Sequence, residues 1–280
     1  MAGTTMNAGK NEPIRRMNHI ANHNAQAWDE LVRQKSGFAS RVSARCLNNP
    51  DPYINIYDWL PEGVRGKRVL CLAAGGGKHG PLYAAAGAEV TVVDASQAML
   101  HKDREMAAKH GLQIQCIQTC MTQLEGLGKG VYDLVMQPVS SCYIKEIDRL
   151  HQAVAGALKP GGLYIVQHKQ PMSLQCSPFP EQGTYRVENP ASVDEALPPV
   201  AGSEHREVGT LEFLHSLESL VGGLCRHGFV IEDLREPDHQ QANARPGSFG
   251  HRCAMIRPYL VLKARRRMEY GVDFSTLIAS

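Results

Sequence analysis

The chain has 280 residues, of which 43% are hydrophobic and 21% are charged, and a chain of this size buries roughly 70–75% of its unfolded surface on folding. Because 30 Lys and Arg residues face 28 Asp and Glu residues, the formal net charge is only +2, which disfavours extended binding to nucleic acid. No run of about 18 apolar residues and no signal-peptide stretch is present. We therefore expect a cytoplasmic protein, monomeric or homodimeric, without a membrane partner.

Cysteine and histidine spacings give no metal or disulfide signature. The 8 Cys residues include no CxxC pair, and several lie inside apolar runs, so neither a zinc knuckle nor a disulfide framework is indicated. His19 and His23 share a helix face, but no acid or third His lies near them in the sequence. Because metal sites need three or four ligands, no metal site is predicted.

The amino-terminal quarter predicts an arm followed by a helical lead-in. Residues 1–16 are small, polar and charged without periodicity, which is typical of a disordered arm. In the lead-in, residues 17–66, apolar side chains recur at helical spacing from residue 18 to about residue 34, and 48–66 is rich in Pro, Asn, Asp and Gly. We expect an amphipathic helix on which Trp28 either anchors the helix to the core or closes over a ligand.

Residues 67–266 are predicted to form one α/β domain. Short apolar runs alternate with helical stretches, the runs being RVLCLA, EVTVVD, QIQCIQ, YDLVMQP and LYIVQH. This alternation is typical of a doubly wound, mostly parallel sheet covered on both faces. Residues 171–208 lack periodicity and are too long for a plain connection, so we expect an insertion that caps a site. A helix is predicted near 212–228. The runs FVIEDLREP and YLVLKARR are the sixth and seventh predicted strands, a polar loop at 238–256 lies between them, and a tail follows at 267–280.

A glycine loop and an acid point to a nucleoside-containing ligand. The first strand runs into three consecutive glycines, Gly75 to Gly77, which let the backbone approach a ligand closely, and the helix that follows presents free N–H groups to negative charge. The next strand ends in Asp94, 17 residues after Gly77. A carboxylate at this position can accept both hydroxyls of an adenosine ribose.

Two families of enzyme share this arrangement. Gly75, Gly77 and Gly80 spell GxGxxG, the fingerprint of dinucleotide binding, so a nicotinamide-dependent oxidoreductase is one interpretation, although a lone fingerprint is weak evidence. No Tyr-x-x-x-Lys pair begins at Tyr143, after the fourth strand. The oxidoreductase therefore remains an alternative without its expected catalytic pair.

From Val69 to His168 the chain resembles the class I S-adenosylmethionine-dependent methyltransferases. The resemblance rests on AAGGG at 73–77, VTVVDAS with Asp94, YDLVMQP as the fourth strand and LKPGGLYIVQH as a turn and fifth strand. It extends more loosely to Arg265 and implies an antiparallel hairpin of the last two strands. It also implies S-adenosyl-L-methionine as the cofactor, with contacts from Ala73, Ala74, Gly75, Gly77, His79, Asp94, Ala95, Met99, Cys120, Met121 and Gln137.

The sequence departs from the family pattern at three places. Cys71 stands where an acid is usual, Ala73 stands at the first glycine, and Cys120 lies where many members carry an Asp for adenine. We expect Met99 and Met121 to pack against adenine, the alternative being that they are core residues. The departures also leave open a cofactor-binding regulatory protein without activity.

The resemblance implies methyl transfer to a small-molecule acceptor through an O, N or C nucleophile. In-line displacement needs the two reacting atoms held about 3–3.5 Å apart, and a base only if the acceptor is protonated. The acceptor is expected beyond the carboxyl ends of the fourth and fifth strands. There His168 is the candidate base, because its ring titrates near neutrality; the alternative is a strand-capping residue. Candidate substrate contacts are Tyr143, Lys169, Tyr185 and His251.

Overall fold

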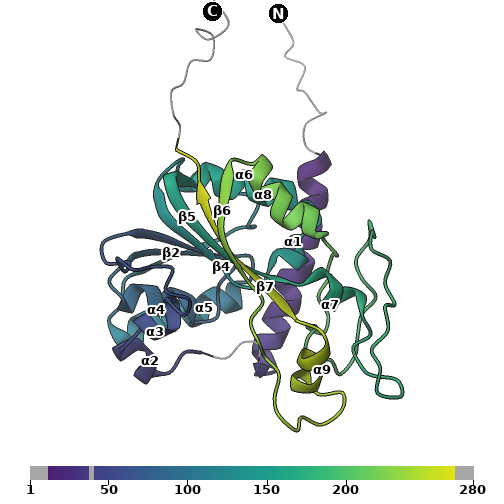
Figure 1. Ribbon diagram of the computed structural model, residues 1–280. Helices are drawn as coiled ribbons and strands as arrows, with labels where there is room; N and C mark the ends of the chain where they lie inside the picture. Colours follow the sequence, from purple (N-terminus) through teal and green to yellow (C-terminus); the bar gives the residue numbers. More distant parts are fainter. Residues whose placement is uncertain (1–11, 38–40, 269–280) are drawn as a thin grey trace, which may run out of the picture.

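A seven-stranded sheet runs through the computed structural model, which describes residues 12–37 and 41–268 (Figure 1). Its strand order is β3-β2-β1-β4-β5-β7-β6. The first five strands in the chain pair in parallel, whereas β7 pairs antiparallel with both β5 and β6. The predicted doubly wound sheet with an antiparallel last hairpin is confirmed. The strands are β1 (Arg68–Leu72), β2 (Glu89–Asp94), β3 (Ile114–Gln118), β4 (Tyr132–Gln137), β5 (Leu158–Lys169), β6 (Phe229–Arg235) and β7 (Tyr259–Arg266).

Helices cover both faces of the sheet. In Figure 1, α4 and α5 lie on one side of the strands and α6 and α8 on the other. The described α-helices are α1 (Glu12–Arg33), α2 (Ala44–Asn48), α3 (Asp51–Ile54), α4 (His79–Ala85), α5 (Gln97–His110), α6 (Ile147–Ala157), α7 (Pro171–Gln175), α8 (Gly223–Arg226) and α9 (Phe249–Met255). Shorter turns are η3 (Glu125–Leu127), η4 (Ser141–Tyr143) and the π-helical η5 (Glu218–Gly222). None of the helices in this described part of the chain is long and apolar enough to cross a membrane.

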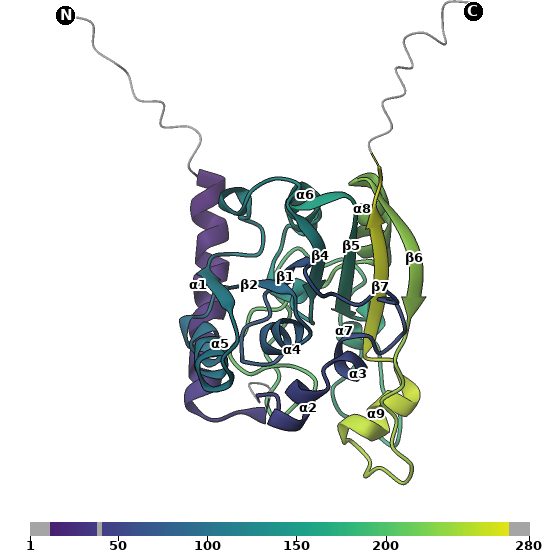
Figure 2. The ribbon, with the colours of Figure 1, turned by 90° about the vertical axis from the view of Figure 1, so that its left-hand side faces the viewer.

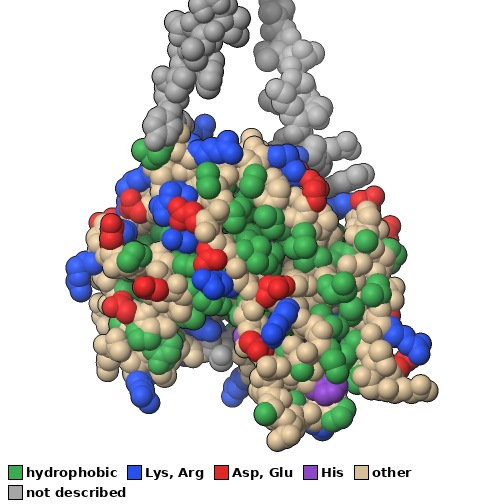
Figure 3. Space-filling model, in the orientation of Figure 1, with side chains coloured by type: hydrophobic (Ala, Val, Ile, Leu, Met, Phe, Trp, Pro, Cys, Tyr) green, Lys and Arg blue, Asp and Glu red, His purple; other side chains and the backbone are tan. Residues whose placement is uncertain are grey.

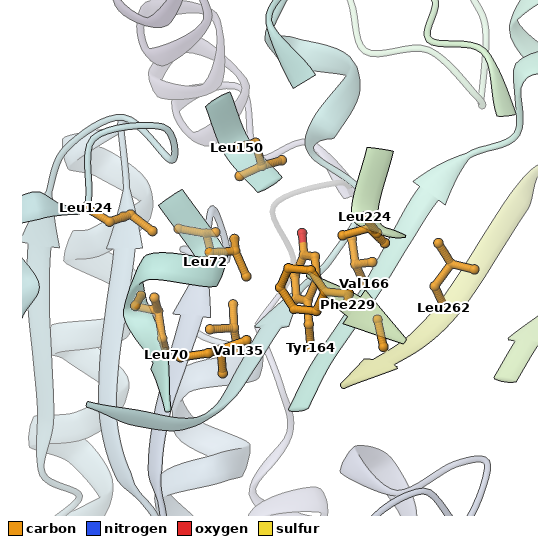
Figure 4. Close-up of a cluster of buried hydrophobic side chains, with 14 of the residues drawn as sticks. Leu70, Leu72, Leu124, Val135, Leu150, Tyr164, Val166, Leu224, Phe229 and Leu262 are labelled. Atoms are coloured by element: carbon orange, nitrogen blue, oxygen red, sulfur yellow. The ribbon is translucent and has the colours of Figure 1, made fainter. Parts of the chain in front are cut away.

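The strands bury apolar side chains on both faces because successive side chains alternate. Leu70 and Val135 point into the cluster under α6 and α8, together with Tyr164 and Phe229, as Figure 4 shows. Their neighbour Cys71 points into the cluster under α4. Residues buried on both faces are what a parallel sheet between two helical layers requires.

The helix α1 packs beside α5 and across η4 (Figure 2). It begins at Glu12, so residues 12–16 of the predicted disordered arm are helical, with Pro13 in the first turn, where proline is favoured. Residues 1–11 of that arm and 269–280 of the predicted tail lie outside the described residues. The side chain of Asn24 ties α1 to η4, because its Nδ2 donates to the carbonyl of Tyr143 at 3.0 Å.

The chain from the start of β5 onward differs from the predicted structure in three ways. The helix predicted near 212–228 begins only at Leu217, and an extended stretch precedes it. The amide of Phe213 in this stretch donates to the carbonyl of Cys142, so it is not available for a hydrogen bond within a helix. The predicted polar loop at 238–256 contains α9, capped by Ser248. The turn predicted at LKPGG is part of β5, which begins at Leu158 directly after α6 ends at Ala157.

The surface carries charges of both signs. On the face that β6 and β7 present, Lys and Arg side chains are interspersed with Asp and Glu around hydrophobic side chains (Figure 3). Val230 and Leu234 of β6 are among the exposed hydrophobic residues. This face has no concentrated basic stripe of the kind that a nucleic-acid backbone needs.

Candidate active site

A cavity of about 400 Å³ opens along the carboxyl ends of the parallel strands. Loops after β1, β2, β3 and β4 line it, and α1 contributes Ala21, Asn24, Ala25 and Trp28. Trp28 also packs edge-on against Tyr143, with ring centroids 5.9 Å apart, so it anchors α1 to η4, and its closing over a ligand stays a prediction. Of the predicted cofactor contacts, Ala73, Gly75, His79, Asp94, Ala95, Met99, Cys120 and Met121 line the cavity.

Asp94 lies at the end of β2 and is joined to the glycine loop. Its Oδ2 accepts a hydrogen bond from the amide of Gly75 at 2.9 Å, and its Oδ1 accepts one from the amide of Ser96 at 2.9 Å. Burial raises the pKa of Asp94 to about 6 despite these two donors. A Cβ on Gly75 would lie 2.9 Å from the same Oδ2, so only glycine allows this approach.

The buried carboxyl of Asp103 on α5 also holds the glycine loop, a role that the sequence analysis missed. Its Oδ2 accepts a hydrogen bond from the amide of Gly76 at 2.8 Å, and burial raises its pKa to about 7. A signal was present in the sequence, because Asp103 falls on the same helix face as the buried Met99 and Met106. An acid on an otherwise apolar helix face is a candidate for a specific buried contact.

Three predicted cofactor contacts do not line the cavity. Ala74 is buried in the cluster under α4. Gly77 turns away, and its carbonyl accepts from the amide of Val42, so that its neighbour Gly76 lines the cavity instead. Gln137 lies behind the wall, where its Nε2 donates to Ser140 Oγ at 2.8 Å. Ser140 itself lines the cavity.

The structure places His168, the candidate base, outside the lining of the cavity. His168 is completely buried, and its Nδ1 lies 2.6 Å from Ser141 Oγ. Its neighbour Gln167 lines the cavity, and successive strand residues point to opposite faces, so the ring of His168 points away from the cavity. Burial lowers the pKa of His168 to about 3. The ring is therefore neutral at physiological pH, and its pKa lies far below the value near neutrality that was expected.

The wall of the cavity near β5 and η4 carries charged and phenolic groups. Tyr143, which was predicted to contact substrate, lines the cavity, and so does Glu207 from the predicted insertion. Burial raises the pKa of the Tyr143 phenol well above its usual value, and the charge of Glu207 adds to the effect. Tyr259, at the start of β7, completes this part of the wall.

Lys169 lies behind this wall and does not line the cavity. Its Nζ donates to Glu207 Oε2 at 2.6 Å and to Glu212, which also pairs with Arg206. Burial alone would lower the pKa of Lys169, but the nearby carboxylates, that of Glu207 foremost, outweigh it and raise the pKa. Two cations and two anions thus form a buried network that fastens the insertion to β5.

Tyr185 and His251 contact each other outside the cavity. The Tyr185 hydroxyl lies 2.9 Å from His251 Nδ1, and neither residue lines the cavity wall. Arg252 of α9, next to His251, donates to Ser173 Oγ of α7 at 2.6 Å. The pair therefore belongs to the packing of the insertion against α9, away from the cavity, although both residues were predicted to contact substrate.

Comparisons with known proteins identify the family. Residues 69–162 match the family model of a methyltransferase domain. The chain is 30% identical over 234 residues, 79% of this chain and 91% of the other, to YbaJ of Bacillus subtilis (strain 168), described as an uncharacterized methyltransferase. The chain belongs to the S-adenosylmethionine-dependent methyltransferases. This membership sets aside the oxidoreductase interpretation.

Further relatives agree with this membership over shorter or more distant matches. The structure of an S-adenosylmethionine-dependent methyltransferase from Mesorhizobium loti superposes with a TM-score of 0.61 at 25% identity, covering 79% of this chain and 100% of the other. A ubiquinone biosynthesis O-methyltransferase from Shewanella pealeana is 31% identical over 117 residues, which cover 41% of this methyltransferase and 50% of that protein.

Proposed function

We propose that this methyltransferase binds S-adenosylmethionine and a small-molecule acceptor together in the cavity. The observation that carries the proposal is the extent of the cavity along the sheet edge, from Asp94 at the end of β2 to Tyr259 at the start of β7. These strands are four steps apart in the sheet order, a distance of roughly 19 Å at about 4.8 Å per step. Such a length accommodates a nucleoside at one end and an acceptor at the other.

The cofactor end fits a nucleoside-containing ligand. Gly76, which lines the cavity, has a φ of +118°, and a Cβ on it would clash with Met99 Cε at 2.9 Å, so the backbone of the loop and the Met99 side chain approach closely only because residue 76 is glycine. In our proposal Asp94 accepts the ribose hydroxyls and Met99 and Met121 pack against adenine. His79 donates to the carboxylate of the methionine part, since burial lowers its pKa to about 3 and keeps an N–H on a neutral ring.

At the acceptor end, Glu207 is the proposed proton acceptor. When bound, the cofactor supplies an electrophilic methyl group. Glu207 would take the proton of an acceptor O–H or N–H that faces its carboxylate. The acceptor oxygen or nitrogen would then be free to bond to the methyl carbon, while the bond between that carbon and the cofactor sulfur breaks and S-adenosylhomocysteine leaves. Lys169 positions Glu207 through their 2.6 Å contact, and Tyr143 orients the acceptor. The enclosure of the cavity by α1 favours a small molecule over a protein chain.

Binding and transfer test this proposal separately. Calorimetry should show saturable binding of S-adenosylhomocysteine and no binding of NADH. A panel of acceptors with radiolabelled S-adenosylmethionine then tests transfer; hydroxyl acceptors come first, because the Shewanella relative is named as an O-methyltransferase. Asp94→Ala removes the acid proposed to hold the ribose and should weaken this binding, whereas Asp51→Ala, which changes an exposed residue, serves as its control. Absence of S-adenosylhomocysteine binding would refute the cofactor site, and binding without transfer to any acceptor class would favour the regulatory alternative.

A further inference from the structure

A second group of polar side chains lies outside the cavity, between α6 and the end of α8. Asp148 and His151 are three residues apart on α6, so both occupy one helix face, and His227 follows α8. One possible ligand atom from each of the three residues lies within 4.8 Å of the other two. His227 Nδ1 is 3.9 Å from Asp148 Oδ1, and the rings of His151 and His227 are 5.8 Å apart.

His151 is the unusual member of this group. It is completely buried, yet neither of its ring nitrogens has a hydrogen-bond partner among the residues that the structure describes. A buried polar atom without a partner is unfavourable, and here one ring carries two. A neutral imidazole keeps a lone pair on one of its two nitrogens, and this lone pair can bind a ligand.

The packing around His151 points the ring toward α8. A Cβ on Gly223, the first residue of α8, would lie 2.8 Å from His151 Nδ1, so the ring lies directly against the backbone of this helix. His227 is also held in place, because its Nδ1 donates to the carbonyl of Gly223 at 2.8 Å, which leaves Nε2 as the nitrogen of His227 that can bind a metal ion. Such a hydrogen bond to a backbone carbonyl is the usual way in which a ligating histidine is oriented.

Exposure rises in steps from the bottom of the group to the surface. His151 is fully buried, the His227 side chain is 25% exposed and the Asp148 side chain is 65% exposed. The nearby cation Arg226 pairs with Glu218 at 2.6 Å, so its charge is balanced. An ion from solvent can therefore meet the carboxylate first and the buried imidazole last.

We propose that Asp148, His151 and His227 bind a divalent transition-metal ion, with zinc fitting the donors best. Two imidazole nitrogens and one carboxylate oxygen suit zinc, whereas magnesium and calcium prefer oxygen ligands throughout. Three protein ligands leave a fourth position for water. Zinc ligands lie about 2.0–2.1 Å from the metal, so the three donor atoms, now within 4.8 Å of one another, would need to move closer together. Rotation of the exposed Asp148 side chain can bring its carboxylate toward the imidazoles. The ion would join α6 to α8 and is independent of methyl transfer.

Zinc binding to the full chain tests the site. After chelator treatment and dialysis, calorimetry with ZnCl₂ should show one saturable site, and ZnCl₂ should raise the unfolding temperature. His227→Ala and Asp148→Asn should each weaken binding at least tenfold, about 1.4 kcal/mol. Both residues are partly exposed, so these variants are expected to fold. A substitution of His151, which is fully buried, could unfold the protein and is therefore not used.

His101 provides a matched control. It is an exposed histidine on α5 whose Nε2 lies 3.4 Å from Glu105 Oε1. The two residues form an acid and histidine pair on a helix, and no third ligand joins them among residues 12–37 and 41–268. His101→Ala should bind zinc like the unaltered protein. The proposal is overturned if the unaltered protein shows no saturable zinc binding, if His227→Ala binds zinc as tightly as His101→Ala, or if MgCl₂ binds with the affinity of ZnCl₂.

Discussion

The amide of Gly75 donates a hydrogen bond to Oδ2 of Asp94 over 2.9 Å, and this contact joins the loop after β1 to the end of β2. The other oxygen of the same carboxylate accepts from the amide of Ser96, the residue that caps α5. One side chain thus orders three segments that line the cavity. The acid proposed to hold the ribose also shapes the glycine loop before any ligand binds.

Asp94→Ala should weaken the binding of S-adenosylhomocysteine by about 1.5–3 kcal/mol, the scale of a hydrogen bond to a charged group. This is roughly a 10- to 150-fold rise in Kd. Calorimetry on the folded variant measures it. An unchanged Kd would show that another residue holds the ribose.

Cofactor affinity should depend on pH through the same carboxyl group. Burial raises the pKa of Asp94 to about 6, and ribose hydroxyls donate to the ionised form. Below pH 6 the carboxyl is protonated, so affinity should fall, by up to about tenfold per pH unit; above it affinity should level off. Asp94→Asn should bind weakly and lose this dependence, whereas Asp103→Asn should keep it. A flat profile between pH 5 and 8 in the unaltered protein would contradict the assignment.

The contact between α1 and α5 should contribute to both stability and cofactor binding. Ser96 Oγ donates to Asp29 Oδ1 at 2.5 Å, and the amide of Ala98 donates to the same oxygen at 3.1 Å. Asp29→Ala should therefore lower the free energy of unfolding by about 1 kcal/mol, as loss of a helix cap does, and raise the Kd for S-adenosylhomocysteine. Glu30→Ala is the control, since Glu30 pairs only with Arg33 and Gln34 among the described residues. Equal effects in the two variants would refute a specific role for Asp29.

The fold and the cofactor end of the site could be predicted from the sequence because their signals are local. Apolar runs bounded by turns mark the strands, and Asp94 directly follows one of them, so its place at the carboxyl edge needs no tertiary information. The resemblance to a family supplied the antiparallel hairpin of the last two strands. The choice between Gly76 and Gly77 was missed, because it depends on the φ angles within the turn.

The acceptor end could not be predicted, for two physical reasons. The strand that carries His168 is buried on both faces, so its residues show no polar alternation from which the direction of a side chain could be read. Glu207 belongs to a stretch without periodicity, and it reaches the cavity through ion pairs that join residues far apart in the chain, such as Lys169 and Glu212. Such long-range ion pairs leave no local pattern in the sequence from which the position of Glu207 could be predicted.

His168→Asn should leave turnover nearly unchanged, rather than lowering it by the roughly 10²–10⁴ expected for loss of a general base. The ring points away from the cavity, and its contact is Ser141 Oγ at 2.6 Å. The substitution should instead lower the free energy of unfolding by about 1–3 kcal/mol, because it disturbs a buried hydrogen bond. Turnover against pH, measured in the folded variant, checks both statements. A lost pH limb together with a large fall in turnover would return His168 to the mechanism.

Glu207→Gln should lower turnover by roughly 10²–10⁴ with the affinity for S-adenosylhomocysteine nearly unchanged, because the amide cannot take the proton of the acceptor. The substitution also breaks a buried ion pair with Lys169, which costs about 3–5 kcal/mol of stability. Stability and chemistry must therefore be separated.

Glu212→Gln provides that separation. Glu212 pairs with Lys169 in the same network but does not line the cavity, so its variant should lose comparable stability and keep most of its turnover. Exposed Glu195, in the same insertion, gives a second control in which neither quantity should change. If Glu212→Gln loses as much turnover as Glu207→Gln at a temperature where both are folded, then the network acts by fastening the insertion. In that case the proton of the acceptor leaves by a route other than Glu207.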